Sequence, residues 1–290
     1  MKRAIMFQLL ILSMVLGTPL AVQAQTDLKN SSQGNIPCDR PVEAACEQVR
    51  LGVKAFRSKN YPDAVNHFRN AADLDPSYVN AKLYLGSALL QEYVPGQESP
   101  ENLQIAKQAI EAFEAVLKLD PKNTIALASI ALLYYNQKQF DKAKPYELRL
   151  IEVDPTKPEP YYWVGLIDWV VCFPRTQQMR KDLRLDVPQD MSQPNVLPPL
   201  PEDARARLAS ENGAAVEEGL QNLKKAIELK PDDINSMAYL NLLYRQKAEL
   251  EASADARQED LRLADEWVKK SLELGRRQNP QATQQQNPPQ

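Results

Sequence analysis

The sequence predicts an all-α solenoid of about five antiparallel helix pairs. The first observation is composition, because the 290 residues are rich in the helix formers Ala, Leu, Glu, Gln and Lys and contain only 9 glycines. The second is that no alternating run rich in Val, Ile and Thr predicts a strand. The third is an amphipathic helix that recurs along the chain and is followed each time by a proline. These prolines are Pro76, Pro121, Pro155 and Pro231.

Residues 1–24 predict a signal peptide. Lys2 and Arg3 precede a short apolar run, and Val22 and Ala24 are the small residues before a cleavage site after Ala24. The run is shorter than the roughly 20 apolar residues of a membrane-spanning helix. We therefore expect export to the periplasm or beyond the cell, with no membrane insertion after cleavage. An uncleaved N-terminal anchor is the alternative.

The charge balance argues against nucleic acid as a partner. The net charge is −3 and becomes −5 when Lys2 and Arg3 are removed with the signal peptide. Nucleic-acid-binding proteins usually carry a basic patch, and this mildly acidic chain does not predict one.

The cysteines are Cys38, Cys46 and Cys172, and export permits a disulfide. On one continuous helix, Cys38 and Cys46 would lie about 12 Å apart, which is too far to bridge. Pro41 predicts that the helix begins near it, which would let Cys38 fold back toward Cys46. A Cys38–Cys46 bridge and three thiols outside any disulfide both remain open, and neither alternative places Cys172 in a disulfide.

Counting back from each proline reveals a common register. With Pro76 at position 32 of a unit, small residues occupy positions 8, 20 and 27, and large apolar residues occupy positions 7 and 24. Small residues let two helices approach closely, and the large ones fill the seam between them. In the first unit these residues are Leu51, Gly52, Ala64, Phe68 and Ala71.

This spacing resembles the tetratricopeptide repeat, and the resemblance implies a right-handed superhelix of helix pairs. The expected repeat domain covers 41–274, between a flexible linker at 25–40 and a disordered Gln/Pro-rich tail at 275–290. The units lie near 45–78, 79–123, 124–157, 158–233 and 234–274.

Several units depart from the ideal repeat. The second has about 11 extra residues near "EYVPGQESPENL", which predicts an exposed loop. Pro145 lies inside the second helix of the third unit and should kink that helix or delay its start. The fifth unit has no helix breaker between its two helices, so we expect both to be long and to cap the array.

A long insertion, about 172–213, interrupts the fourth unit. The start of the insertion is locally basic, and "PNVLPPLP" predicts an extended chain. A helix should begin after Pro201, and Gly213 is a candidate position for a break in that helix. The insertion could bind a partner, fill the groove beside Trp169, or form a surface excursion, and these alternatives stay open.

A second resemblance covers the C-terminal half. The stretches "YYWVGLIDWVVCF" and "MAYLNLLYRQKAELEAS" are similar to uncharacterised exported tetratricopeptide-repeat proteins of environmental bacteria, acidobacteria among them. This resemblance implies no known activity.

The sequence predicts neither catalysis, nor a metal site, nor a cofactor. His67 is the only histidine, and it directly precedes the core residue Phe68. There is no HExxH, no glycine-rich phosphate loop and no CxxC.

The resemblance implies that the first helix of each unit lines a concave face, at positions 2, 5, 6, 9, 12 and 13 of the unit. These positions hold apolar and aromatic residues with scattered amides, which suit a peptide. For Tyr162 and Trp169, packing under the insertion is an equal alternative. The candidate partner-binding residues are Leu83, Tyr84, Ser87, Leu132, Tyr135, Asn136, Tyr162, Leu166, Trp169 and Arg245.

The predicted function is a non-enzymatic scaffold or adaptor in the cell envelope that binds a protein or peptide through its concave face. The alternative is a structural or assembly component of an outer-membrane or secretion complex that uses the convex face or the insertion. The sequence specifies neither the partner nor the oligomeric state.

Overall fold

The computed structural model describes residues 42–187 and 197–278, and within these ranges it contains helices and their connections but no strand. The predicted all-α class is confirmed. The chain divides into two compact units. Their described parts are residues 42–154, the N-terminal unit, and residues 155–187 with 197–278, the C-terminal unit. The handedness of the array stays a prediction, because each unit is described by itself.

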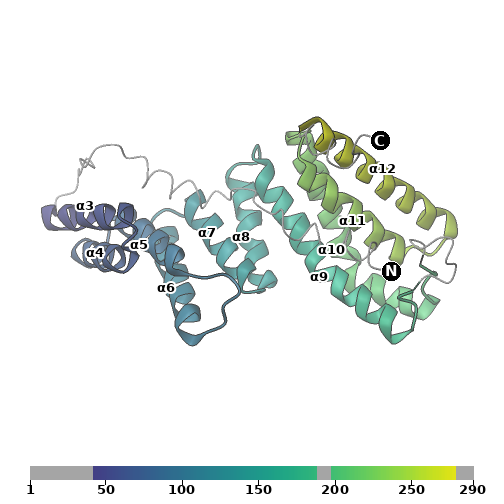
Figure 1. Cartoon of the computed structure of the whole chain (residues 1–290), viewed down its shortest axis with the longest axis horizontal. Helices are drawn as coiled ribbons and strands as arrows, with labels where there is room; N and C mark the ends of the chain where they lie inside the picture. Colours follow the sequence, from purple (N-terminus) through teal and green to yellow (C-terminus); the bar gives the residue numbers. More distant parts are fainter. Residues whose placement is uncertain (1–41, 188–196, 279–290) are drawn as a thin grey trace, which may run out of the picture. The chain divides into compact units, whose positions relative to one another are not determined.

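In the N-terminal unit, each helix packs against the next along the chain, which gives three successive antiparallel pairs (Figure 1). The predicted units 45–78, 79–123 and 124–157 each contain one pair. The helices are α3 (Glu43–Arg57), α4 (Tyr61–Leu74), α5 (Val79–Glu92), α6 (Pro100–Leu119), α7 (Thr124–Asn136) and α8 (Phe140–Val153).

Local signals set the helix boundaries. The Asn60 and Asn123 side chains cap α4 and α7 by accepting a backbone N–H of the first turn. Lys59 and Lys138 adopt left-handed backbone conformations, with φ of 60° and 59°, in the turns after α3 and α7. These turns are closed by backbone hydrogen bonds, from Asn60 to Ala55 and from Gln139 to Tyr134.

The predicted contact between positions 8 and 24 is present. A Cβ atom added to Gly52 would lie 2.6 Å from the Phe68 ring, and one added to Gly86 would lie 2.8 Å from Phe113. The two helices of the first pair, and those of the second, are therefore held at a distance that only glycine permits. The third pair departs from this pattern, with Ala131 at position 8 and Glu147 at position 24.

One of two expectations for the N-terminal unit is confirmed, and the other needs correction. Residues 94–98, between α5 and α6, are exposed, as the expected loop required. The extra residues of the second unit form a short connection after α5 and otherwise lengthen α6 to 20 residues. The buried Asn102 side chain closes the connection by hydrogen bonds to Val94 and Gln97. Pro145 does not delay α8, which runs from Phe140 to Val153, because the loss of one backbone donor is offset by the packing of the helix on α7.

The described residues of the C-terminal unit form four long helices, which are labelled α9 to α12 in Figure 1. Each packs on its sequence neighbour, and α9 also contacts α11. The helices are α9 (Pro158–Asp182), α10 (Glu202–Leu229), α11 (Ile234–Leu250) and α12 (Ala254–Gln278).

Most of the described insertion is helical. Residues 172–182 continue α9, and residues 202–213 begin α10, which passes through Gly213 without the break considered above. An added Cβ at Gly213 would meet no atom within 4 Å, so this glycine faces open space rather than a bend. The insertion therefore mainly lengthens the fourth helix pair, which corrects the surface-excursion alternative for these residues.

Some predicted segments lie outside the described residues: the signal peptide 1–24, the linker 25–40, Cys38, and residues 279–290 of the tail. Residues 275–278, assigned above to a disordered tail, belong to α12. Cys46 and Cys172 are buried, and the Cys38–Cys46 bridge stays a prediction. None of the described helices combines the length and the apolar character needed to cross a bilayer.

Candidate functional site

Four aromatic rings gather where α9 contacts α11, and we call Tyr162, Trp169, Phe173 and Tyr239 the aromatic cluster. Tyr239 meets Tyr162 at a centroid distance of 5.8 Å and Trp169 at 5.4 Å, both edge to face. Trp169 stacks on Phe173 at 5.0 Å. Because α9 and α11 are the first helices of consecutive predicted units, the cluster forms on the side that the resemblance assigns to the concave face.

The cluster has a buried layer and a more accessible one. Tyr162 and Tyr239 are buried, whereas Trp169 and Phe173 are half-buried. The Trp169 indole Nε1 is itself buried, and no atom of the described residues accepts a hydrogen bond from it. An unsatisfied buried donor costs about 1–3 kcal/mol, so such groups are uncommon unless they serve a purpose.

The structure also decides how Trp169 relates to the insertion. Its stacking partner Phe173 lies within the insertion, and its second ring neighbour, Tyr239, lies on α11. Trp169 therefore packs partly against the insertion, as the alternative expected, and retains some exposed surface.

Three other candidate residues are buried. Leu83, Ser87 and Leu166 have little or no exposed surface, and the Ser87 hydroxyl donates to the Leu83 carbonyl at 2.8 Å. These side chains contribute to helix packing rather than to an accessible face.

The remaining candidates are half-buried, and the structure does not gather them into one site. Tyr84 contacts Phe68 and Tyr135 contacts Phe140, at centroid distances of 5.5 and 5.4 Å. Leu132 and Asn136 lie with them in the N-terminal unit. In the C-terminal unit, Arg245 pairs with Asp265 of α12.

The sequence reasoning missed Tyr239 and Phe173. Tyr239 occupies position 6 of the fifth unit, so the repeat register contained the signal that identifies it. Phe173 lies one helical turn after Trp169, and it enters the cluster only because α9 continues into the insertion.

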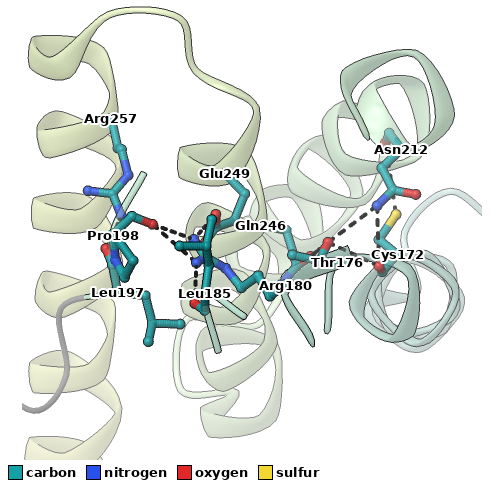
Figure 2. Close-up of polar contacts among 10 residues, drawn as sticks. All are labelled: Cys172, Thr176, Arg180, Leu185, Leu197, Pro198, Asn212, Gln246, Glu249 and Arg257. Carbon is teal, nitrogen blue, oxygen red and sulfur yellow. Dashed lines mark hydrogen bonds and ion pairs between the residues drawn. The ribbon is translucent and has the colours of Figure 1, made fainter. Parts of the chain in front are cut away.

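A buried polar network fixes the insertion to α11 and α12 (Figure 2). The Arg180 side chain has no exposed surface, and its guanidinium donates to the carbonyls of Leu185 at 2.9 Å and Pro198 at 3.1 Å. It also forms an ion pair with Glu249 of α11. Arg257 of α12 donates to the Leu197 carbonyl at 2.9 Å.

One turn before Arg180 on α9, the Thr176 hydroxyl lies 2.6 Å from the Gln246 side-chain oxygen (Figure 2). Asn212 of α10 donates to the Cys172 carbonyl at 3.2 Å. These contacts connect α9, α10 and α11 and satisfy polar groups that burial would otherwise penalise. Their role is therefore to order the lengthened helix pair.

The N-terminal unit has a groove of about 450 Å³ on α7 and α8. Tyr134 and Tyr146 stack in it at 6.0 Å, with Lys142 above the first ring and Arg149 above the second. Burial is the main cause that raises the pKa of both tyrosine hydroxyls above their ordinary value, and the nearby Glu114 adds to it. The lining of this tyrosine groove is Tyr134, Asp141, Lys142, Pro145, Tyr146 and Arg149.

The described residues contain no group of three or more His, Cys, Asp and Glu side chains that could hold a metal ion. His67 lies 2.8 Å from the Gln48 side-chain oxygen through its Nδ1 atom, which connects α4 to α3. This histidine therefore has a packing role.

Comparisons with known proteins agree with the repeat register. Two family models described as "Tetratricopeptide repeat" match residues 49–92 and 106–163. The chain is similar in fold to a structure of MamA, residues 41 to the end, from Desulfovibrio magneticus RS-1. The TM-score is 0.52 at 18% identity, with 82% of this chain and 98% of that chain covered. Another MamA crystal structure gives a TM-score of 0.51 at 15% identity, with 80% and 95% covered. No curated protein matches the sequence.

Proposed function

Because the chain is a tetratricopeptide-repeat protein, we propose that it is a non-enzymatic scaffold that binds a protein or peptide at the aromatic cluster. The cluster is the observation that carries this proposal. Tryptophan and tyrosine bury a large area at low entropic cost, and they are enriched among residues that dominate binding energy.

The two layers of the cluster have different roles in this proposal. Trp169 and Phe173 supply the accessible contact surface, and the buried Tyr162 and Tyr239 hold Trp169 in place. An extended peptide offers backbone carbonyls, and one of these would satisfy the Trp169 N–H once the indole, whose Nε1 is buried in the unbound chain, turns toward the bound peptide. A partner with an apolar or aromatic side chain beside a free carbonyl fits both features.

The proposed location is the cell envelope or the exterior, on the basis of the signal-peptide pattern in residues 1–24. Fractionation of the native organism and N-terminal sequencing of the mature chain test it. A cytoplasmic protein that retains Met1 would contradict the location and would leave the scaffold proposal intact.

The scaffold proposal is tested by capture from the envelope fraction with residues 25–290 as bait. Trp169→Ala should lose the partner, because it removes the accessible ring and the unsatisfied donor. Trp267→Ala is the matched control, since Trp267 lies half-buried on α12 beside Lys270, away from the cluster's ring contacts. Binding should then be repeated with the purified partner by calorimetry, after circular dichroism shows equal helicity.

Equal affinity of wild type and Trp169→Ala would refute binding at the aromatic cluster. The tyrosine groove favours a second candidate, an assembly component that uses a surface other than the concave face. Loss of the partner in Tyr134→Ala, with binding retained in Trp169→Ala, would support that candidate.

A further inference from the structure

The terminal helix α12 docks on α11 with a carboxylate in the interface. Asp260 and Ala264 are its fully buried residues, and Asp260 is only 5% exposed. No hydrogen bond or ion pair reaches the Asp260 carboxylate from the described residues. A charged group in such a place loses its hydration without a compensating partner.

The charged groups around Asp260 do not compensate for the cost of burying its ionised carboxylate. Lys247 and Glu251 lie on α11, Glu217 lies on α10, and Glu259 lies on α12 itself. Lys247 already pairs with Glu217, with a distance of 3.2 Å between Nζ and Oε1. One lysine and three glutamates therefore surround the Asp260 carboxylate.

This environment favours the protonated acid. Burial raises the pKa of Asp260 from 3.8 to about 6, with smaller contributions from the three glutamates, and Lys247 opposes the change. The pKa of Asp260 is higher when α12 is docked than when Asp260 is exposed to water. Protonation of Asp260 therefore favours docking, and this contribution is fully present below about pH 4. It is lost progressively as the pH rises through about 6.

We propose that α12 is a pH-responsive cap, which docks firmly while Asp260 is protonated and opens more often once Asp260 is ionised. Opening would also break the ion pair between Arg245 and Asp265, which crosses from α11 to α12. Opening of the cap thus separates the Arg245 guanidinium, whose side chain is already 38% exposed, from its countercharge.

Hydrogen exchange of the mature chain between pH 5 and pH 8 tests this proposal. Peptides from 254–278 are compared with peptides from α3 in the same sample, after correction for intrinsic exchange rates. The equilibrium constant for opening of α12 should rise about tenfold between pH 5 and pH 8. This factor follows from an Asp260 pKa near 6 in the docked helix and near 4 in the open one. Asp260→Asn should abolish the rise, and Glu273→Gln, which changes an exposed acid on the same helix, should retain it.

An unchanged rise in Asp260→Asn would overturn the proposal. If that variant does not fold, Lys247→Met provides the second test. Removal of the opposing cation should move the midpoint of α12 opening to higher pH, and an unchanged midpoint would also overturn the proposal.

Discussion

Glu147 on α8 is predicted to weaken the N-terminal unit, and replacing it should stabilise the fold. It occupies position 24 of the third pair, where Phe68 and Phe113 stand in the first two pairs. Its side chain is 6% exposed, and none of the described residues gives it a hydrogen bond or ion pair. Burial raises the pKa of this carboxyl well above its ordinary value.

The size of the effect follows from the cost of burying a polar group without a partner, about 1–3 kcal/mol in proteins. We expect Glu147→Leu to raise the free energy of unfolding by that amount at pH 7. Leucine is preferable to phenylalanine, because the facing residue is Ala131 rather than the glycine that admits a ring in the other pairs.

The gain should depend on pH. The pKa of Glu147 in the folded protein is raised above the ordinary 4.5. The contribution of the protonated Glu147 to the free energy of unfolding is therefore fully present below about pH 4.5, and it is lost as the pH rises through the folded-state pKa. The advantage of Glu147→Leu over wild type should therefore grow from pH 5 to pH 8. Glu147→Gln, which cannot ionise, should show a flatter profile than wild type.

Urea unfolding followed by circular dichroism measures the effect, and amide exchange of residues 140–153 locates it. Glu152→Leu is the control, because Glu152 is an exposed acid on the same helix. The reasoning fails if Glu147→Leu is no more stable than wild type at pH 8, or if its gain is the same at pH 5 and pH 8.

Two further substitutions test the helix packing, and a third tests the buried ion pair of Arg180. Gly86→Ala should destabilise the N-terminal unit by about 1–3 kcal/mol, because its Cβ would meet the Phe113 ring, whereas Gly213→Ala should stabilise α10 by about 0.5–1 kcal/mol. Thermal melts of the two variants should therefore shift in opposite directions, and shifts of the same sign would contradict the assigned contacts. Glu249→Gln should cost about 3–5 kcal/mol, because the buried Arg180 guanidinium loses its countercharge. A loss below 1 kcal/mol in urea unfolding, followed by tryptophan fluorescence, would show that the backbone carbonyls alone satisfy Arg180.

The helix pairs were predictable because each signal is local. The prolines at position 32 and the caps at Asn60 and Asn123 act within one or two turns. The small residue at position 8 and the large one at position 24 meet wherever two such helices pack, and Gly165 accordingly faces Leu223 in the fourth pair. A repeat register therefore predicts both the elements and their closest contacts.

The errors arose where tertiary contacts override local preference. Pro145 is tolerated inside α8 because that helix packs on α7. Gly213 faces open space, and its buried neighbours Asn212 and Val216 hold α10 together around it. The ordering of the insertion depends on Arg180 and Glu249, which are 69 residues apart in sequence. No local pattern connects them.

The candidate surface was predictable only in part. The register placed Tyr162 and Trp169 on the helix that forms the cluster, but it did not show that Leu83, Ser87 and Leu166 would be buried. Exposure depends on what the neighbouring helices contribute, and a repeat position does not encode that.

The left-handed lysines in the turns after α3 and α7 have a consequence for engineering. A non-glycine residue at a φ near 60° holds conformational strain, and Lys59 and Lys138 hold it at equivalent points of two repeats. Glycine at these positions would release that strain without altering either helix of the pair or any ring of the aromatic cluster. The protein thus contains two sites at which its durability could be adjusted independently of the surface that it presents to other molecules.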